Sequence, residues 1–292
     1  MRTMTPQVLG ILGGSGIYDL PGLTDTRWQR VDTPWGEPSD ELFFGTLQGL
    51  QLVFLPRHGR GHKIPPSDLN FRANIAALKS VGVTDVLSLS AVGSLRESLP
   101  PGHFVVVDQF IDRTAGRASS FFGRGLVAHV SMAHPVCGRL GRHVQAALAD
   151  MDLPHSHGGT YVAMEGPQFS TLAESNLYRS WNCDVIGMTN MPEAKLAREA
   201  ELCYASVAMV TDFDCWHPQH DAVTVDAIIK VLLGNAANAQ SLVVKLADAI
   251  GHDGHAADCA CRRALDHALI TAPAARDAQM IEKLRGIAGR VL

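Results

Sequence analysis

Short runs of apolar, often β-branched residues alternate along this chain with longer segments in which apolar residues recur every three or four positions. The short runs are typical of buried strands, and the longer segments are typical of amphipathic helices. The pattern predicts strands over residues 8–13, 42–47, 52–55, 85–91, 104–108, 160–164, 184–188 and 204–212. It predicts helices over residues 70–81, 135–151, 171–181, 191–200 and 223–250. Strands that alternate with helices indicate a sheet whose faces are covered by helices.

The order of these elements predicts one main domain and a C-terminal extension. We expect an α/β fold in which residues 1–250 form a single domain around a central mixed, mostly parallel sheet flanked by helices. Ser170 stands directly before the helix at 171–181 and is expected to be its N-cap. The stretch GHDGH at 251–255 begins an extension, residues 251–292, with helices expected at 256–270 and 277–287. This extension is expected to pack on the same domain or on a neighbouring subunit.

The composition of the 292 residues narrows the class of protein. Hydrophobic residues make up 46% and charged residues 18%, which excludes a disordered polyelectrolyte. Lys and Arg number 25 against 29 Asp and Glu, so neither nucleic acid nor a membrane surface is expected as a partner. We find no apolar run of membrane-spanning length and no signal-peptide core, and six cysteines are too few for a disulfide-stapled scaffold. We expect a cytoplasmic protein.

Three predicted strands end in residues suited to contact an anion. The first strand runs into Gly13-Gly14-Ser15-Gly16, where backbone N–H groups and a hydroxyl can approach a ligand closely. Arg57-His58 follows the strand at 52–55, and Ser90-Ala91 ends the strand at 85–91. Because ligands of α/β sheets bind at strand ends, the three turns together indicate an anion site, although each alone is explained equally well as a simple turn or surface loop.

The glycine turn does not carry the signature of a nucleotide cofactor. Position 19, where the dinucleotide fingerprint G-x-G-x-x-G needs its last glycine, is Asp. No Gly-Lys-Ser/Thr follows either, so the phosphate-binding loop of nucleoside triphosphatases is absent.

A pair of carboxyl groups, Asp212 and Asp214, ends the apolar strand at 204–212. Residues i and i+2 of an extended chain point to the same side, so the two side chains are expected to lie together. A carboxyl group held protonated at a sheet end can donate a proton to a leaving group, and an ionised one can accept hydrogen bonds from an amino group. The alternative is an ordinary capping pair.

Several longer motifs resemble the purine nucleoside phosphorylase superfamily, and more closely its trimeric 5′-methylthioadenosine phosphorylase branch. The resemblance spans roughly residues 8–250. It is carried by Gly13-Gly14-Ser15-Gly16, Arg57-His58-Gly59, Asn70-Phe71-Arg72-Ala73-Asn74, Ser94-Leu95-Arg96, the segment 108–114, the segment Glu165-Gly166-Pro167-Gln168-Phe169-Ser170, Met188-Thr189-Asn190-Met191-Pro192-Glu193 and Thr211-Asp212-Phe213-Asp214-Cys215-Trp216.

The resemblance implies phosphorolysis: inorganic phosphate, as co-substrate, cleaves the N-glycosidic bond of a purine nucleoside, with no metal and no organic cofactor. For the methylthioadenosine branch the expected products are adenine and 5-methylthioribose 1-phosphate. Catalysis of this kind needs a phosphate held at C1′ and a proton for the departing purine. The resemblance assigns the phosphate cradle to Ser15, Arg57, His58, Ser90, Ala91 and Thr189.

The same resemblance assigns the nucleoside contacts. Phe169 is expected to pack on the purine and Met188 on the ribose. Asp212 is expected to protonate N7, assisted by Asp214 at the 6-amino group. Relatives that act on 6-oxopurines commonly carry Asn at the position of Asp212, so an aspartate favours a 6-aminopurine.

The resemblance assigns substrate specificity at the 5′ end of the sugar to Ser170, Val225, Ile228, Ile229 and His129. The three aliphatic residues suit a methylthio group, because burying a thiomethyl group is worth about 1–2 kcal/mol. In the family a neighbouring subunit contributes the histidine that His129 matches, which implies a homotrimer.

Two alternative functions remain open. The first is phosphorolysis of methylthioinosine or of 6-oxopurine nucleosides such as inosine. The second is a non-catalytic nucleoside-binding protein on the same sheet.

The C-terminal segment carries His252, His255, Cys259 and Cys261 in the spacing H-x2-H-x3-C-x-C. This spacing is unlike that of standard zinc fingers, so we predict no metal and free thiols. Similar cysteine pairs form disulfides in some thermophilic relatives, and a pairing of Cys137 with Cys203 is left open.

Overall fold

The computed structural model describes residues 7–14, 16–218, 225–253 and 259–292, and within helix α5 it describes the side chains of residues 231 and 233–251. In these residues eleven strands form one mixed sheet. The strands are β1 Val8–Gly13, β2 Thr24–Gln29, β3 Leu42–Leu47, β4 Leu50–Pro56, β5 Asp85–Ser94, β6 Phe104–Val107, β7 Gln109–Asp112, β8 His155–His157, β9 Thr160–Ala163, β10 Val185–Gly187 and β11 Cys203–Asp212.

The sheet runs in the order β2-β3-β4-β1-β5-β10-β9-β7, and β11 joins β5 to the pair β6 and β8. β1 lies parallel to both β4 and β5, and β11 lies parallel to β5. β10 and β6 run antiparallel to β5 and β11, respectively. Because β1, β4, β5 and β11 point the same way, their carboxyl ends meet at one edge, where α/β sheets place ligands.

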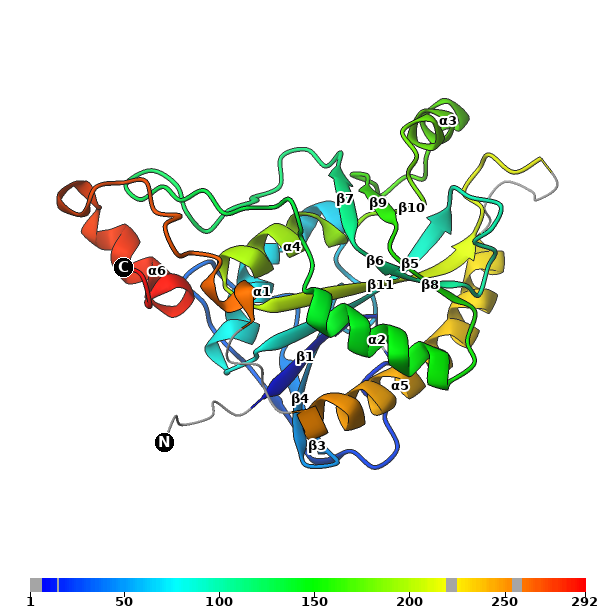
Figure 1. The fold of residues 1–292 in the computed structure, drawn as a ribbon, viewed down its shortest axis with the longest axis horizontal. Helices are drawn as coiled ribbons and strands as arrows, with labels where there is room; N and C mark the ends of the chain where they lie inside the picture. The colour runs from blue at the N-terminus through cyan, green and yellow to red at the C-terminus, as the bar shows by residue number, and fades with distance from the viewer. Residues whose placement is uncertain (1–6, 15, 219–224, 254–258) are drawn as a thin grey trace.

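Helices cover both faces of this sheet (Figure 1). They are α1 Phe71–Ser80, α2 Gly138–Asp150, α3 Leu172–Ser180, α4 Asn190–Glu199, α5 Val225–Asp253 and α6 Ala278–Ala288, with short 3₁₀ helices η1 Pro66–Asp68, η2 Ala260–Arg263 and η3 Pro273–Ala275. α1 and α4 pack on one face together with α6, and α2 and α5 pack on the other. α3 projects from the body of the molecule, which it contacts through Tyr178 in one apolar cluster with Val162 of β9 and Ile186 of β10.

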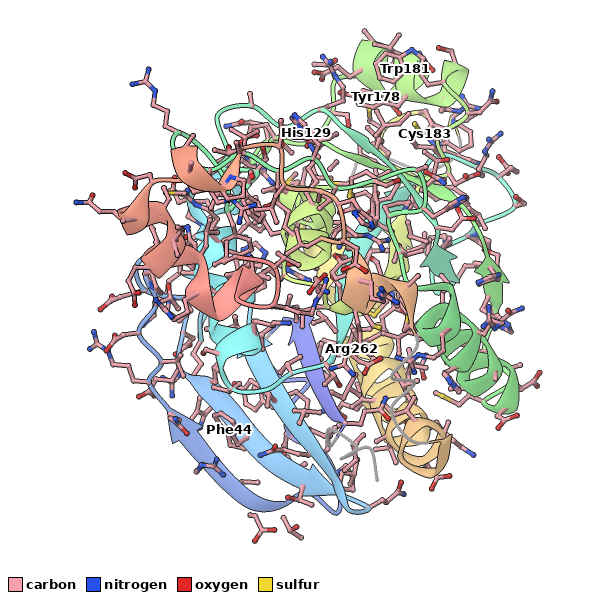
Figure 2. All side chains as sticks on the ribbon, turned by 60° about the vertical axis from the view of Figure 1, so that its left-hand side comes forward. Phe44, His129, Tyr178, Trp181, Cys183 and Arg262 are labelled. Atoms are coloured by element: carbon pink, nitrogen blue, oxygen red, sulfur yellow. The ribbon has the colours of Figure 1, made fainter. Side chains whose placement is uncertain are left out.

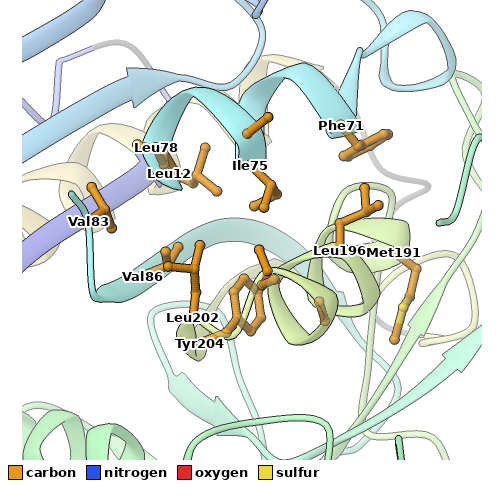
Figure 3. Packing of buried hydrophobic residues seen from close by; sticks show 14 of the residues in the cluster. Leu12, Phe71, Ile75, Leu78, Val83, Val86, Met191, Leu196, Leu202 and Tyr204 are labelled. Carbon is orange, nitrogen blue, oxygen red and sulfur yellow. The ribbon is translucent and has the colours of Figure 1, made fainter. Parts of the chain in front are cut away.

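Two apolar cores, one on each side of the sheet, hold these layers together. Figure 3 shows the first, in which Ile75 and Leu78 of α1 face Val86 of β5 and Leu196 of α4. The second joins the other face of the sheet to Leu140 and Val144 of α2 and to α5. The strands between them are buried on both faces, which is why they read as continuous apolar runs.

The fold class expected from the sequence is confirmed: a mixed sheet with mostly parallel neighbours is flanked by helices. All eight predicted strands are present within a few residues of their expected bounds. Three observed strands have no counterpart among the predictions. β2 is almost wholly exposed and polar, β7 continues from β6 after a single residue, and β8 is only three residues long, so none has an apolar run.

Two predictions about helices are wrong. The N-cap of α3 is Thr171 rather than Ser170, because Thr171 and Glu174 form a reciprocal capping box. The helix expected at 256–270 does not form in its described part, residues 259–270, which contains only η2 and turns. The backbone N–H of Leu265 donates to the Glu201 carboxylate (3.0 Å) instead of to a carbonyl one helical turn earlier, and His267 adopts a positive φ of 63°.

The described part of the C-terminal extension ends in α6, whose Leu284, Ile287 and Ala288 join the core that contains α1. Among the described residues, no helix combines the length and the apolar character needed to cross a bilayer.

Candidate active site

The end of β5 is where the sheet becomes uncovered. Residues from Asp85 to Ser90 are buried, but Ala91 is exposed and Gly93 is partly exposed. Alternate residues of a strand share a face, so these two positions open on the same side. A Cβ atom at Gly93 would lie 3.0 Å from Asp212 Oδ1 and 3.1 Å from Ile186, so glycine lets the β11 carboxylate approach the strand closely.

Asp212 and Asp214 lie together at this uncovered end. A register shift between Val210 and Asp212 brings Asp212 opposite Gly93. The backbone N–H of Asp214 donates to Asp212 Oδ1 (2.8 Å), and the Thr211 hydroxyl donates to Asp212 Oδ2 (2.7 Å). Burial raises the pKa of both carboxyl groups, in part opposed by these hydrogen bonds at Asp212. A raised pKa is what a proton-donating carboxyl group requires.

Arg57 follows β4 and is buried in a polar network rather than exposed on a loop. Its Nε donates to Glu193 Oε2 (2.8 Å), and its Nη2 donates to Glu193 Oε1 (3.2 Å) and to the Ser88 hydroxyl (2.7 Å). Burial opposes the charge, yet the paired Glu193 carboxylate raises the pKa of Arg57. Nη1 carries two N–H groups and donates to Leu89 O (3.0 Å), which leaves one N–H for an anion.

The network extends from Arg57 to two hydroxyl groups. The Ser90 and Thr189 hydroxyls lie 3.0 Å apart, one within β5 and the other at the N-cap of α4. Asn190 Nδ2 donates to the Ser88 hydroxyl (3.0 Å) and at longer range to that of Ser90 (3.5 Å). Together with the start of α4, these hydroxyl groups form a set of neutral donors around one point.

His58 follows Arg57, and a hydrogen bond to the backbone fixes the tautomer of its ring. Its Nδ1 is 2.8 Å from the carbonyl of Ile64, and a carbonyl only accepts, so Nδ1 carries the proton. Burial, together with neighbouring Arg57 and His62, lowers the pKa of His58 to about 4. Its Nε2 is therefore an acceptor at neutral pH, and the ring stacks on His62 with a centroid distance of 4.3 Å.

A buried guanidinium, that of Arg117, shapes the loop that leads to Thr189. Its Nη1 donates to the carbonyls of Met188 (2.6 Å) and Met191 (2.9 Å), and its Nη2 donates to that of Glu165 (2.7 Å). Met188 lies so close to Gly166 that a Cβ there would be 2.4 Å from its sulfur. Arg117 thus ties together the two segments that carry Met188 and Phe169.

The remaining predicted site residues are placed as follows. Phe169 is 51% exposed and Ser170 is partly buried beside Cys215, whose thiol donates to the Ser170 carbonyl (3.4 Å). His129 is exposed on a long loop, with its backbone N–H bonded to Ala268 O (2.9 Å) (Figure 2). Ser15 lies outside the described residues. The backbone at positions 225, 228 and 229 belongs to helix α5, but the side chains of Val225, Ile228 and Ile229 lie outside the description.

The structure therefore brings together Arg57, Ser90, Ala91, Thr189, Asp212 and Asp214 around the carboxyl end of β5. Sequence reasoning did not find Glu193, Ser88 or Arg117, which hold this arrangement. Glu193 lay within a quoted motif, and its signal was a carboxylate among the mostly apolar residues that α4 buries.

The arrangement has two chemically distinct ends. The end near Arg57, Ser90 and Thr189 offers N–H and O–H donors to an oxyanion. The end near Asp212 and Asp214 offers two carboxyl groups whose pKa is raised by burial, and the negative charge of Asp214 raises the pKa of Asp212 further. Ser90 and Gly93 are three residues apart on β5, so about 10 Å separates the two ends along the strand.

Comparison with known proteins gives a consistent result. The family model described as "Phosphorylase superfamily" matches residues 8–248. Proteins from Rhodospirillum rubrum and Bradyrhizobium diazoefficiens, both named S-methyl-5′-thioadenosine phosphorylase, are each 62% identical, over 98% and 99% of this chain and 97% and 99% of their own.

Solved structures agree in fold over nearly the whole chain. A methylthioadenosine phosphorylase from an antarctic soil metagenomic library superposes with a TM-score of 0.90 at 48% identity, over 97% of this chain and 99% of its own. The methylthioadenosine phosphorylase of Schistosoma mansoni in complex with adenine gives a TM-score of 0.83 at 38% identity, over 88% and 96%.

Proposed function

The chain belongs to the Phosphorylase superfamily, and from this premise we propose that it cleaves S-methyl-5′-thioadenosine with inorganic phosphate. A phosphate oxygen attacks C1′ of the sugar while the C1′–N9 bond breaks. The electron pair of that bond leaves with the purine, which takes up a proton at N7. The products are adenine and 5-methylthioribose 1-phosphate, and the enzyme is a pentosyltransferase of purine and methionine salvage.

One observation supports this proposal most directly. Buried carboxyl groups of raised pKa and a cluster of anion-binding donors stand at the same uncovered end of one strand, β5. A phosphorolysis that passes through an oxocarbenium-like state needs both an anion held beneath C1′ and an acid at the leaving base. The spacing of about 10 Å leaves room for a nucleoside between them.

At the phosphate end, each group has a defined task. The remaining N–H of Arg57 and the hydroxyls of Ser90 and Thr189 donate to phosphate oxygens, and the exposed Ala91 offers its position on β5 for a backbone contact. His58, neutral with Nε2 unprotonated, accepts the remaining proton of the phosphate. Because Glu193 already neutralises Arg57, the cradle attracts the anion mainly through oriented dipoles. Ser15 completes the cradle through the family resemblance.

At the purine end, Asp212 donates the proton to N7, and Asp214 accepts from the 6-amino group. Burial keeps Asp212 protonated to a higher pH than an exposed aspartate, and its raised pKa supports the role of acid. Phe169 packs on the purine and Met188 on the ribose. A carboxyl pair suits adenine better than a 6-oxopurine, because an ionised Asp214 repels a carbonyl oxygen.

We assign 5′ specificity to Ser170, Val225, Ile228 and Ile229, with His129 supplied by a neighbouring subunit.

Residues 1–250 form the catalytic domain, and residues 251–292 form the C-terminal extension. The active unit is a homotrimer in the cytoplasm. The reaction uses phosphate as co-substrate and no other cofactor. The exposure of His129 in the single chain supports its use in a neighbouring site.

The test is to incubate the protein with methylthioadenosine, adenosine, methylthioinosine and inosine, each with and without phosphate, and to follow release of the free base. We expect phosphate-dependent release that is fastest from methylthioadenosine. Faster release from methylthioinosine or inosine would overturn the assigned specificity. Release without phosphate would indicate a hydrolase, and binding without release would indicate a nucleoside-binding protein.

A further inference from the structure

Four cysteines from three distant parts of the chain meet in one buried cluster. Cys137 is the N-cap of α2, Cys203 is the first residue of β11, and Cys259 and Cys261 lie at the start of η2. All four sulfur atoms lie within 4.8 Å of one another, with 3.6 Å from Cys137 to Cys259 and 3.5 Å from Cys203 to Cys259. In Figure 2 the η2 segment that carries Arg262 lies beside α2, which shows how the C-terminal segment reaches this place.

The separations match a single metal ion better than any disulfide. A disulfide needs about 2.05 Å between its sulfurs, whereas all six cysteines are free thiols in this structure. Zinc binds thiolates at about 2.3 Å, so the edges of a tetrahedral ZnS₄ unit are about 3.8 Å long. The two hydrogen-bonded sulfur pairs are slightly shorter than this edge, and the remaining distances do not exceed 4.8 Å.

The surroundings suit four negative thiolates. Arg198 Nη1 lies 3.6 Å from the Cys261 sulfur, and Arg139 interacts electrostatically with Cys137 and Cys203. Cys137 also stands at the positive end of α2, and its thiol makes no capping hydrogen bond there. Two cations and a helix N-terminus are the kind of environment that stabilises a dianionic tetrathiolate.

We propose that Cys137, Cys203, Cys259 and Cys261 bind one Zn²⁺ in a tetrahedral structural site. This replaces the sequence-based expectation of no metal, which considered only the tail motif with His252 and His255. His255 and the side chain of His252 lie outside the described residues, and the proposed site does not use them. On binding, four S–Zn bonds form, the thiol protons pass to solvent, and no electron is transferred.

The choice of zinc follows from the donor set. Four thiolates select zinc, copper(I) or iron over hard cations, and a set of four sulfurs within 4.8 Å surrounds one ion rather than a polynuclear cluster. A closed set of four protein ligands leaves no position for substrate, so the ion is structural. It would join η2 to β11 and α2 and thereby hold the C-terminal extension on the domain.

The first experiment measures metal in the protein as purified under reducing conditions, by inductively coupled plasma mass spectrometry. We expect about one zinc per chain. The double variant Cys259→Ser, Cys261→Ser should contain less than a tenth of this amount. Cys183→Ser, which removes a buried cysteine outside the cluster, should keep the full amount.

A second experiment keeps the native sequence, because the double variant can lose metal simply by failing to fold. Metal is removed from the wild-type protein with a chelator, and Co²⁺ is added under nitrogen while the absorption spectrum is followed. We expect intense sulfur-to-cobalt charge-transfer bands together with the visible bands of tetrahedral cobalt, saturating at one equivalent and abolished by Zn²⁺.

Three outcomes would overturn the proposal: iron in place of zinc, a mass about 4 Da lower that reports two disulfides, or thiols that bind neither zinc nor cobalt. Equal zinc content in wild type and double variant would also overturn it. These readouts do not use enzymatic activity, so they are independent of the proposed phosphorolysis.

Discussion

Two buried ionisable residues of the candidate site differ in their charge state. Arg57 keeps its charge because Glu193 is paired with it at 2.8 Å and both side chains are nearly inaccessible. Asp212 accepts from the Thr211 hydroxyl and the Asp214 N–H, and neither of these donors is a cation, so burial favours its neutral form. The first arrangement builds a rigid donor for an anion, and the second builds an acid.

Replacing Asp212 by Asn tests the acid directly. The amide can still accept from the Asp214 N–H, so the fold should be kept, but it has no proton to transfer at N7. We expect kcat/KM for methylthioadenosine to fall by at least about 100-fold, the usual contribution of a general acid. Steady-state kinetics of adenine release measure this loss, and an unchanged rate would remove Asp212 from the role.

The same variant makes a prediction about stability and pH. Because burial raises the pKa of Asp212, the stability from its neutral form is fully present below the unfolded value of about 3.9 and is lost as pH rises through the folded value. Asp212→Asn removes the ionisable group, so the variant does not lose this stability as pH rises. Denaturant unfolding should show wild type losing stability relative to the variant as pH rises above about 4, and parallel curves would contradict the raised pKa.

Replacing Glu193 by Gln tests the buried pair. The change leaves the guanidinium of Arg57 buried without a counter-charge, and the Ser88 and Tyr204 hydroxyls lose a charged acceptor. Breaking one partner of a buried pair costs about 3–5 kcal/mol, which urea unfolding would measure. Glu37→Gln at the exposed Arg30 pair is the control and should change stability by less than about 1 kcal/mol. Equal effects in the two variants would show that the Arg57 pair has no special importance.

At the scale of the elements, α1, β5 and α4 form the core that supports the candidate site. Leu78 of α1 is fully buried in the core that these elements share (Figure 3). Leu78→Ala leaves a cavity there and should lower the free energy of unfolding by about 2–5 kcal/mol. Leu233→Ala on α5, where the side chain is 69% exposed, should change it by less than about 0.5 kcal/mol. Urea unfolding of both variants decides whether this core limits stability.

The elements also show what the sequence could reveal. β1 and β3 were predicted at their observed bounds because both consist of apolar or β-prone residues around a single internal glycine and lie between turn residues. A helix was predicted over 256–270, but its described part, residues 259–270, contains only η2 and turns. Its fold depends instead on contacts to Glu201 and on the meeting of Cys259 and Cys261 with two cysteines more than 50 residues away, which no local pattern encodes.

The candidate site was predicted to a similar degree. Arg57 follows a recognisable strand, and Ser90 and Asp212 lie within two others, so their types and positions could be predicted. Glu193 was not, because its partner is 136 residues distant in sequence and its place on α4 is that of a buried helix position. A buried carboxylate is explained only when the guanidinium that pairs with it is known.

At the scale of the whole molecule, the single chain does not explain why α3 exposes apolar side chains. This helix projects from the body, yet Leu172, Leu177 and Trp181 expose 40–56% of their surface on or beside it. Exposed apolar side chains that are grouped in this way are typical of interfaces, and Phe169, proposed to touch the purine, leads directly into this helix. A neighbouring subunit that covers α3 would therefore also close the site.

Light scattering coupled to size exclusion tests this assembly. We expect a mass of about 94 kDa, three times the 31.4 kDa chain. Leu177→Glu should shift the mass towards the single chain and lower activity, because it puts a charge into the interface. Leu233→Glu, an exposed leucine on α5, should leave both unchanged. A wild-type monomer with full activity would contradict the shared site, since His129 could then serve only its own chain.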